Sequence, residues 1–188
     1  VRHVLPTTLR PREHASVLAV SRSEGESPVT QAVGGPLSGV LVADVSRVLA
    51  GPYATMLLAD IGADVVKVES PTGDDTRTWM PPVRDGESTY YLAINRNKRS
   101  IALDLADDTD RAAARELARR ADVLVENFKP GGLARFDLDY DTVAASNPGV
   151  VYASLSGFGS GPKGAVLPGY YLIVQAISGT QRGTRALY

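Results

Sequence analysis

A strand, helix and strand pattern between residues 40 and 69 most constrains what this chain can fold into. Residues 40–45 are a short β-branched, apolar run of the kind that is buried on both faces of a sheet. Pro52 suits the first helical position because it has no N–H to leave unpaired, and Gly62 suits the C-terminal cap. Residues 63–69 follow as a second strand. The pattern predicts a compact βαβ unit with parallel strands and a right-handed connection.

Strands and helices continue to alternate along the chain. The periodicity predicts strands at 100–105, 121–128 and 150–155, and helices at 109–120, 133–136 and 140–145. Residues 71–87 hold so many Gly, Pro and Asp residues that a long irregular loop is expected there. This alternation predicts an α/β fold with a Rossmann-like, open and mostly parallel sheet that carries helices on both faces.

Composition divides the chain and excludes several classes of function. Residues 1–35 show no sustained period and predict a flexible extension, which also contains both histidines, His3 and His14. Neither a metal site nor a histidine-based triad is therefore expected in the domain that begins at residue 36. The absence of cysteine excludes disulfides and thiolate nucleophiles, and is compatible with a cytoplasmic protein.

Charge and hydropathy speak against two kinds of partner. The chain has 20 Lys and Arg residues against 21 Asp and Glu residues, so its formal net charge is -1. With a net charge so close to zero, the protein has no overall positive potential that would attract nucleic acid or an anionic membrane surface. The most apolar region, residues 40–68, is interrupted by charged residues and cannot supply a membrane span of about 20 apolar residues.

The loops after the strands are the candidate binding sites, because ligands of such sheets bind beyond the carboxyl ends of the strands. Asn127 and Lys129 could place an amide and an ammonium group beside a ligand, with Arg135 as a second cation. The alternatives are a capped turn and an ordinary surface arginine. The basic turn at 95–99 could pair with phosphates, or could be a solvated surface turn.

A glycine-rich loop at 156–164 also invites comparison with phosphate-binding motifs, since glycines let backbone N–H groups approach an anion. The spacing matches neither standard form. Both the dinucleotide fingerprint and the P-loop need glycine where Pro162 stands, and the P-loop needs Ser or Thr where Gly164 stands. A glycine-rich turn or hinge is the alternative interpretation.

Five ordered segments resemble the class III CoA-transferase family, which includes formyl-CoA transferase, carnitine CoA-transferase and α-methylacyl-CoA racemase. These segments are residues 44–52, 58–69, 95–105, 121–131 and 168–170, and the similarity runs from about residue 37 to residue 179. The resemblance implies a Rossmann-like large domain and a homodimer of two interlocked subunits. It also implies acyl-CoA and carboxylic acid substrates, with no permanently bound cofactor.

The same resemblance implies a set of residues that contact coenzyme A. Matched by position, these are Ala50, Leu103, Ala106, Asn127, Phe128, Lys129, Arg135, Gly169 and Tyr170. This set supports the ligand interpretation of the loop after residue 126. It supports a phosphate role for the glycine-rich loop much less.

The resemblance also predicts what the chain lacks. In the transferases an aspartate attacks the acyl-CoA carbonyl, and an anhydride and then an aspartyl-CoA thioester follow. That aspartate lies downstream of the segment 168–170. Here Tyr171 replaces a usual acidic residue, and residues 180–188 form a divergent tail without the expected pattern. We therefore expect a truncated large domain, residues 36–179, that holds no catalytic residue and does not transfer CoA by itself.

Two other functions stay open on the sequence alone. The racemases of the family carry a proton-transferring histidine where Tyr170 stands here, so a transferase is favoured over an α-methylacyl-CoA racemase-like enzyme. A non-catalytic CoA-binding fragment or remnant is the other alternative. The sequence does not identify the acyl group or the acceptor acid.

Overall fold

The computed structural model describes residues 34–167, 169 and 171–178. Most of the expected flexible extension, the tail at 180–188 and the candidate residue Tyr170 lie outside the described residues.

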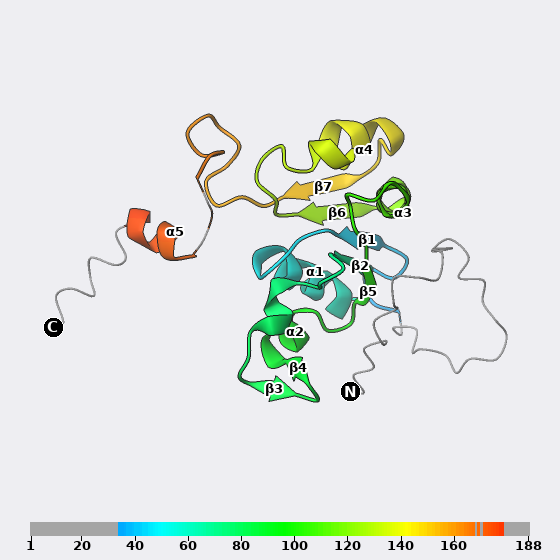
Figure 1. Cartoon of the computed structure of the whole chain (residues 1–188). Coiled ribbons are helices and arrows are strands. Elements are labelled where there is room, and N and C mark those ends of the chain that lie inside the picture. Colours follow the sequence, from blue (N-terminus) through cyan, green and yellow to red (C-terminus); the bar gives the residue numbers. More distant parts are fainter. Residues whose placement is uncertain (1–33, 168, 170, 179–188) are drawn as a thin grey trace.

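A five-stranded parallel sheet forms the centre of the molecule, in the order β5-β2-β1-β6-β7 (Figure 1). Its strands are β1 (Leu41–Asp44), β2 (Asp64–Glu69), β5 (Arg99–Ala102), β6 (Val123–Glu126) and β7 (Val151–Ser154). Every neighbouring pair in this sheet runs parallel. The expected α/β fold is confirmed, and the strand order reverses between β1 and β6, where folds of this kind bind ligands.

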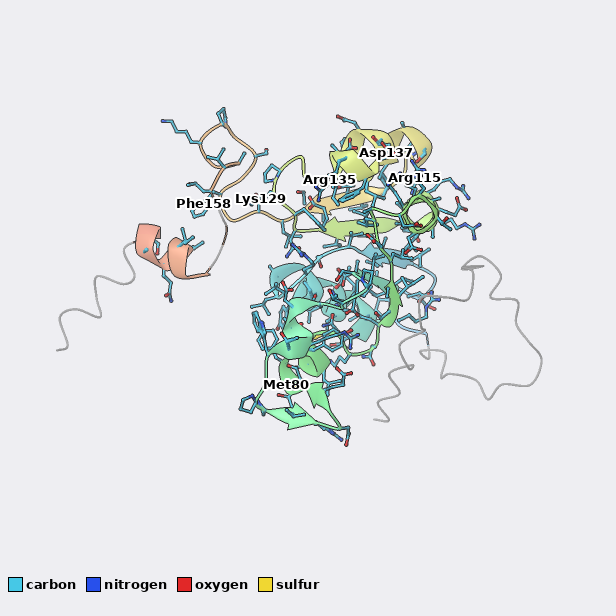
Figure 2. All side chains as sticks on the ribbon, in the orientation of Figure 1. Met80, Arg115, Lys129, Arg135, Asp137 and Phe158 are labelled. Carbon is cyan, nitrogen blue, oxygen red and sulfur yellow. The ribbon has the colours of Figure 1, made fainter. Side chains whose placement is uncertain are left out.

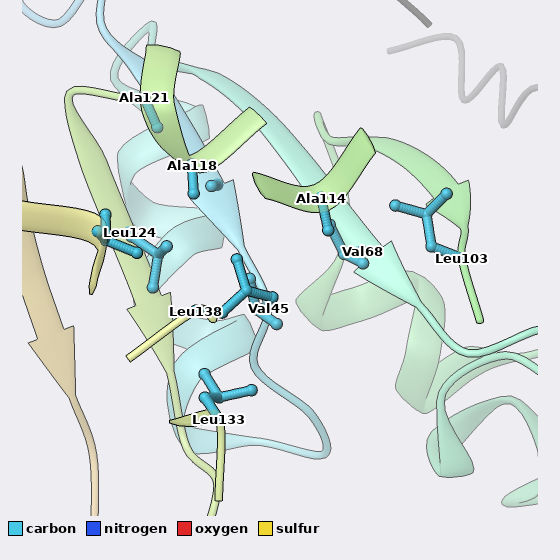
Figure 3. Packing of buried hydrophobic residues seen from close by; sticks show 11 residues of the cluster. Val45, Val68, Leu103, Ala114, Ala118, Ala121, Leu124, Leu133 and Leu138 are labelled. Atoms are coloured by element: carbon cyan, nitrogen blue, oxygen red, sulfur yellow. The ribbon is translucent and has the colours of Figure 1, made fainter. Parts of the chain in front are cut away.

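Helices cover both faces of this sheet, because side chains alternate between the faces along each strand. Val42 of β1 packs with Ala59 of α1 (Ala50–Asp60), whereas the next residue, Ala43, belongs to the opposite cluster. That second cluster includes Ala114 and Ala118 of α3 (Asp108–Arg120), as Figure 3 shows. The short helices η2 (Ala134–Phe136) and α4 (Tyr140–Ser146) lie beyond β6 in the chain, and Val143 of α4 joins the same cluster.

The predicted glycine cap of α1 and the acidic start of α3 are confirmed, but α1 begins at Ala50, two residues before the expected first helical residue Pro52. Gly62 follows α1 with a φ of 107°, a conformation that a side chain would oppose. Its N–H donates to the carbonyl of Ala59 at 3.1 Å, and the N–H of Ala63 donates to that of Leu58 at 3.0 Å. These two bonds form a Schellman motif. At the start of α3, the Asp107 carboxylate accepts the N–H groups of Thr109 and Asp110.

The region between β2 and β5 is more regular than the sequence predicted. It contains η1 (Asp75–Thr78), the antiparallel hairpin β3 (Val83–Arg84) with β4 (Glu87–Ser88), and α2 (Thr89–Ile94). The prediction of one long irregular loop at 71–87 was therefore wrong. These elements have two to six residues, too few to show a period, and tertiary contacts hold them.

One more helix, α5 (Tyr171–Ser178), follows the glycine-rich loop and lies apart from the sheet in Figure 1. Within the part of the chain that the structure describes, no helix is long and apolar enough to cross a membrane.

Candidate functional site

The loops that follow β1 and β6 are joined by one side chain at the reversal of strand order. The Asn127 amide nitrogen donates to the carbonyl of Arg47 at 2.6 Å, and the Arg47 N–H donates to the Asn127 amide oxygen at 2.8 Å. The Asn127 side chain thus bonds to both the N–H and the carbonyl of one residue, as a paired β-strand does. It is engaged within the protein, and its effect is to fix the spacing of the two loops.

The distribution of ion pairs singles out the same edge of the sheet. Among the described residues, the lysines and arginines without a carboxylate within 4 Å are Arg47, Lys129, Arg135 and Lys163. They follow β1, β6 and β7, and Figure 2 shows Lys129 and Arg135 on this side of the molecule. Positive charge left unpaired beside the reversal point suits an anionic ligand.

Aromatic rings support two of these cations. The Arg47 guanidinium lies 5.1 Å from the ring centre of Phe128, and the Arg135 guanidinium lies 4.5 Å from that of Phe136. Stacking of this kind orients a guanidinium and leaves its N–H groups free to donate. Both groups can therefore bind a phosphate without breaking an internal ion pair.

A hollow of about 500 Å³ opens at the carboxyl ends of β6 and β7. Its lining includes Glu126, Lys129, Tyr140, Tyr152, Ser154 and Ser156. The rings of Tyr140 and Tyr152 meet edge to face at 5.8 Å, and the Tyr152 hydroxyl donates to the carbonyl of Leu138 at 2.9 Å. Burial, together with the charges of Glu126 and Asp139, raises the pKa of Tyr152, so its phenol stays a neutral donor.

The other residues implied by the resemblance are spread more widely. Ala50 is exposed and opens α1, close to Arg47 in the chain. Leu103 is only 4% exposed and packs in the core (Figure 3), and its N–H donates to the carbonyl of Glu69. Its side chain and its N–H are therefore both engaged within the protein. Ala106 is exposed beyond β5, on the far side of β2 from β1.

Gly169 is exposed and lies against the glycine-rich loop. A Cβ atom on Gly157 would come within 2.5 Å of the Gly169 Cα, so the two ends of this loop touch through backbone alone. Lys163 projects from the exposed part of the loop between them. The arrangement matches the expected turn better than a phosphate cradle, because the loop closes on itself.

The basic turn at 95–99 is partly solvated, as one interpretation expected, but it is not a free phosphate site. Lys98 is buried and pairs with Asp44 at 3.0 Å, Arg96 pairs with Asp60 at 2.5 Å, and Arg99 pairs with Asp64 at 2.6 Å. Each cation is thus bound to a carboxylate of an earlier element. The turn ties the start of β5 to β1, α1 and β2, and each of its three cations is already paired.

A buried polar layer behind the β1 loop was missed by the sequence reasoning. Lys67 and Asp74 form an ion pair at 3.0 Å with both side chains 1% exposed. The Asp44 carboxylate pairs with Lys98 and also accepts the Thr55 hydroxyl at 2.6 Å. The signal was present, because Asp44 and Lys67 interrupt apolar strands, where an unpaired charge would be costly.

Burial and pairing oppose each other in this layer. Burial would raise the pKa of Glu69, but hydrogen bonds from Arg77, Ser100 and Tyr91 outweigh it and lower the pKa to about 2. Burial lowers the pKa of Lys98 to about 8 although Asp44 favours its charged form. Within the described residues, no cluster of three or more His, Asp or Glu side chains is placed to hold a metal ion.

The fold and this edge define a Rossmann-like domain whose strand-end loops carry unpaired positive charge. Residues 37–185 match the family model described as CoA-transferase family III, and the chain therefore belongs to this family. The match runs past residue 179, where the resemblance was expected to end.

Named relatives are CoA-transferases. The chain is 51% identical over 151 residues to the succinate–glutarate CoA-transferase of Agrobacterium fabrum, covering 77% of this chain and 38% of the relative. It is 48% identical over 145 residues to the human succinyl-CoA:glutarate CoA-transferase, covering 77% and 33%. The chain thus spans about two fifths or less of the length of these relatives.

Solved structures agree with the family and the fold. The crystal structure of a CAIB/BAIF family protein from Brucella suis is 47% identical with a TM-score of 0.73, covering 77% of this chain and 39% of that chain. A hypothetical protein from Mycobacterium tuberculosis is 37% identical with a TM-score of 0.71, covering 78% and 40%.

Proposed function

We propose that this chain supplies the coenzyme A cradle of a CoA-transferase, which passes CoA from an acyl-CoA thioester to a free carboxylic acid through an aspartyl intermediate. The observation that carries the proposal is the set of unpaired cations, Arg47, Lys129, Arg135 and Lys163, beyond β1, β6 and β7. Coenzyme A brings several phosphate charges, and the other described cations are already paired. Membership of the family supports the reaction class.

Lys129 and Arg135 are the proposed phosphate ligands. Both are exposed beyond β6, and an arginine guanidinium can hold two phosphate oxygens at once. Lys129 also lines the hollow of about 500 Å³. With a phosphate bound to Lys129, the rest of the nucleotide would lie along the loop after β6. Asn127 and Phe128 would act indirectly. Asn127 joins the two loops through its bonds to Arg47, and the Phe128 ring orients the Arg47 guanidinium.

The remaining proposed contacts are smaller groups along the same edge. Ala50 would let the ligand approach the first turn of α1, because its side chain ends at Cβ. Leu103 would contribute its carbonyl and Ala106 its exposed surface, while Gly169 and Tyr170 would border the ligand from the last loop. The attacking aspartate of the transferases is expected beyond this set, so we propose binding without transfer for these residues alone.

Calorimetric titration of the 188-residue chain with CoA tests the proposal. We expect saturable binding that weakens as salt is raised, and about 10-fold weaker binding for Arg135→Ala, which loses a charge-assisted contact of about 1.4 kcal/mol. Arg84→Ala is the matched control, since Arg84 is exposed on the β3–β4 hairpin. Pantetheine, which lacks the nucleotide phosphates, should not distinguish Arg135→Ala from the parent. Absence of binding at millimolar CoA would overturn the proposal.

A dicarboxylate is the proposed acceptor for the complete enzyme. The relatives are named for succinate, glutarate, oxalate and mesaconate, all of which carry two carboxylates. Incubation of the full-length enzyme with succinyl-CoA and a panel of labelled acids would test this. Labelled acyl-CoA formed from monocarboxylates alone would contradict it.

A homodimer is the proposed assembly, and the outer face of α1 supports it. Leu49, Tyr53, Leu57 and Ile61 recur every four residues and are each 45 to 50% exposed. An apolar stripe of this length is typical of an interaction surface. Light scattering of the full-length protein should give twice the monomer mass, and Leu57→Glu should reduce it.

The cytoplasm is the proposed compartment, because a chain without cysteine needs no oxidising environment to fold. Fractionation of the native cells should find the protein with cytoplasmic markers. Recovery with an extracytoplasmic fraction would contradict this.

A further inference from the structure

Val48 holds an unusual backbone conformation in the loop between β1 and α1. Its φ is 67°, in the left-handed region that β-branched side chains disfavour. The other non-glycine residues with positive φ among the described ones are Asp85, Asn97 and Asp137, types that tolerate this conformation in turns. Such strain persists only where the surroundings over-determine the conformation.

A buried ion pair touches the loop on both sides of Arg47. The Lys67 ammonium donates to the carbonyl of Ser46 at 2.9 Å, and the Asp74 carboxylate accepts the N–H of Val48 at 3.2 Å. The same Asp74 oxygen pairs with Lys67 at 3.0 Å. Arg47 between them is held from the other side by Asn127. Consecutive residues are thus fixed by Lys67 of β2, by Asp74, which caps η1, and by Asn127 of the loop after β6.

The Lys67–Asp74 pair and its bonds to Ser46 and Val48, here called the clamp, lie beside two residues proposed to contact coenzyme A. Arg47 is one of the unpaired cations and lies over the Phe128 ring, while Ala50 opens α1 just beyond. The backbone conformation of Val48 sets the relative placement of Arg47 and Ala50, because it lies between them in the chain. The buried pair touches no proposed ligand atom, but it determines where these groups stand.

We propose that Lys67 and Asp74 are positioning residues for coenzyme A, holding Val48 in the left-handed conformation that places Arg47 and Ala50 at the binding edge. The inference rests on the proposed function for its ligand. A carboxylate and an ammonium suit the task, because each can bind the loop backbone and the partner side chain at once.

A double-mutant cycle in CoA affinity separates positioning from plain stabilisation. Asp74→Asn should weaken CoA binding about 10-fold. Asp74 uses one oxygen for Val48 and Lys67 and the other for Thr76, and an amide offers only one acceptor oxygen and no negative charge for Lys67. Glycine adopts positive φ without strain, so in the Val48→Gly background the same Asp74→Asn change should cost about 3-fold or less. An equal loss in both backgrounds would overturn the proposal.

Tyr91→Phe is the matched control. Tyr91 is buried in the same polar layer, and its hydroxyl bonds to Glu69 and Arg77 and not to residues 46–48. Its loss should lower stability and leave CoA affinity within 2-fold. If Asp74→Asn does not fold, Lys67→Met/Asp74→Asn removes both buried charges and should give the 10-fold loss. Affinity unchanged in that variant would also overturn the proposal.

Amide hydrogen exchange keeps the test independent of CoA. Removing the pair should speed exchange at Arg47 and Val48 relative to Met56 in α1, whereas Tyr91→Phe should not change that ratio. If the parent chain binds no CoA, the proposed function fails and the exchange ratio alone decides the positioning role. An unchanged ratio would overturn it.

Discussion

The two halves of the sheet differ in how their positive charges are paired. Within β2 and at the start of β5, Lys67, Lys98 and Arg99 each pair with a carboxylate, and the first two are buried. Beyond β1, β6 and β7, Arg47 and Lys129 have no such partner. We call the paired residues of the first half, which stabilise the fold, the support. The second half carries unpaired cations that can bind an anion. A dense basic run in the sequence, as at 95–99, indicated the wrong half.

The largest effect is expected where the support is deepest. Asp44→Ala leaves the Lys98 ammonium buried without its carboxylate, which typically costs about 3–5 kcal/mol. Urea denaturation followed by circular dichroism should show this loss of unfolding free energy. Asp44→Leu with Lys98→Met should recover most of it, since no unpaired charge remains. A loss below about 1 kcal/mol for Asp44→Ala would contradict the supporting role.

The support should also make stability depend on acid. Pairing lowers the pKa of Glu69 from 4.5 to about 2 in the folded state, so its contribution is complete above pH 4.5 and is lost as pH falls toward 2. The shift corresponds to about 3 kcal/mol. Thermal unfolding between pH 2 and pH 5 should be steeper in pH for the parent than for Glu69→Gln. Parallel profiles would show that Glu69 is not the responsible carboxylate.

On the binding half, a loss of charge should change affinity and leave stability alone. Lys129→Gln should weaken CoA binding about 5-fold to 10-fold and reduce the salt dependence, because one exposed phosphate contact disappears. Its unfolding free energy should stay within about 0.5 kcal/mol of the parent. Lys163→Gln tests whether the closed glycine-rich loop contributes at all. A loss of stability in Lys129→Gln would contradict the assignment of Lys129 to binding alone.

The smallest effect is expected at the solvent-exposed end of the support. Arg99→Ala breaks a pair with Asp64 at 2.6 Å, but both side chains are more than half exposed. Exposed pairs contribute about 0–1 kcal/mol, so urea denaturation should detect a change no larger than that. CoA affinity should be unchanged, which would confirm that a basic residue in this turn is not a ligand.

Much of this molecule was predictable from local patterns. The apolar runs of β1, β2 and β6, the helix α3 with its charged ends, and the glycine after α1 each follow from a few consecutive residues. The hairpin and α2 between β2 and β5 were missed, because segments so short carry no period of their own. Their contacts, such as Tyr91 with Glu69, join residues far apart in the chain.

By itself, the sequence determined the parallel α/β fold and the family, because strand and helix periods and ordered motifs are local properties that survive in one dimension. Only the tertiary structure decided which cations are free. Pairing depends on which carboxylate folding brings within about 4 Å, and that distance has no counterpart in the chain. Lys98 and Lys129 each follow an asparagine in the printed sequence by one or two residues, yet one is buried against Asp44 and the other is exposed at the binding edge.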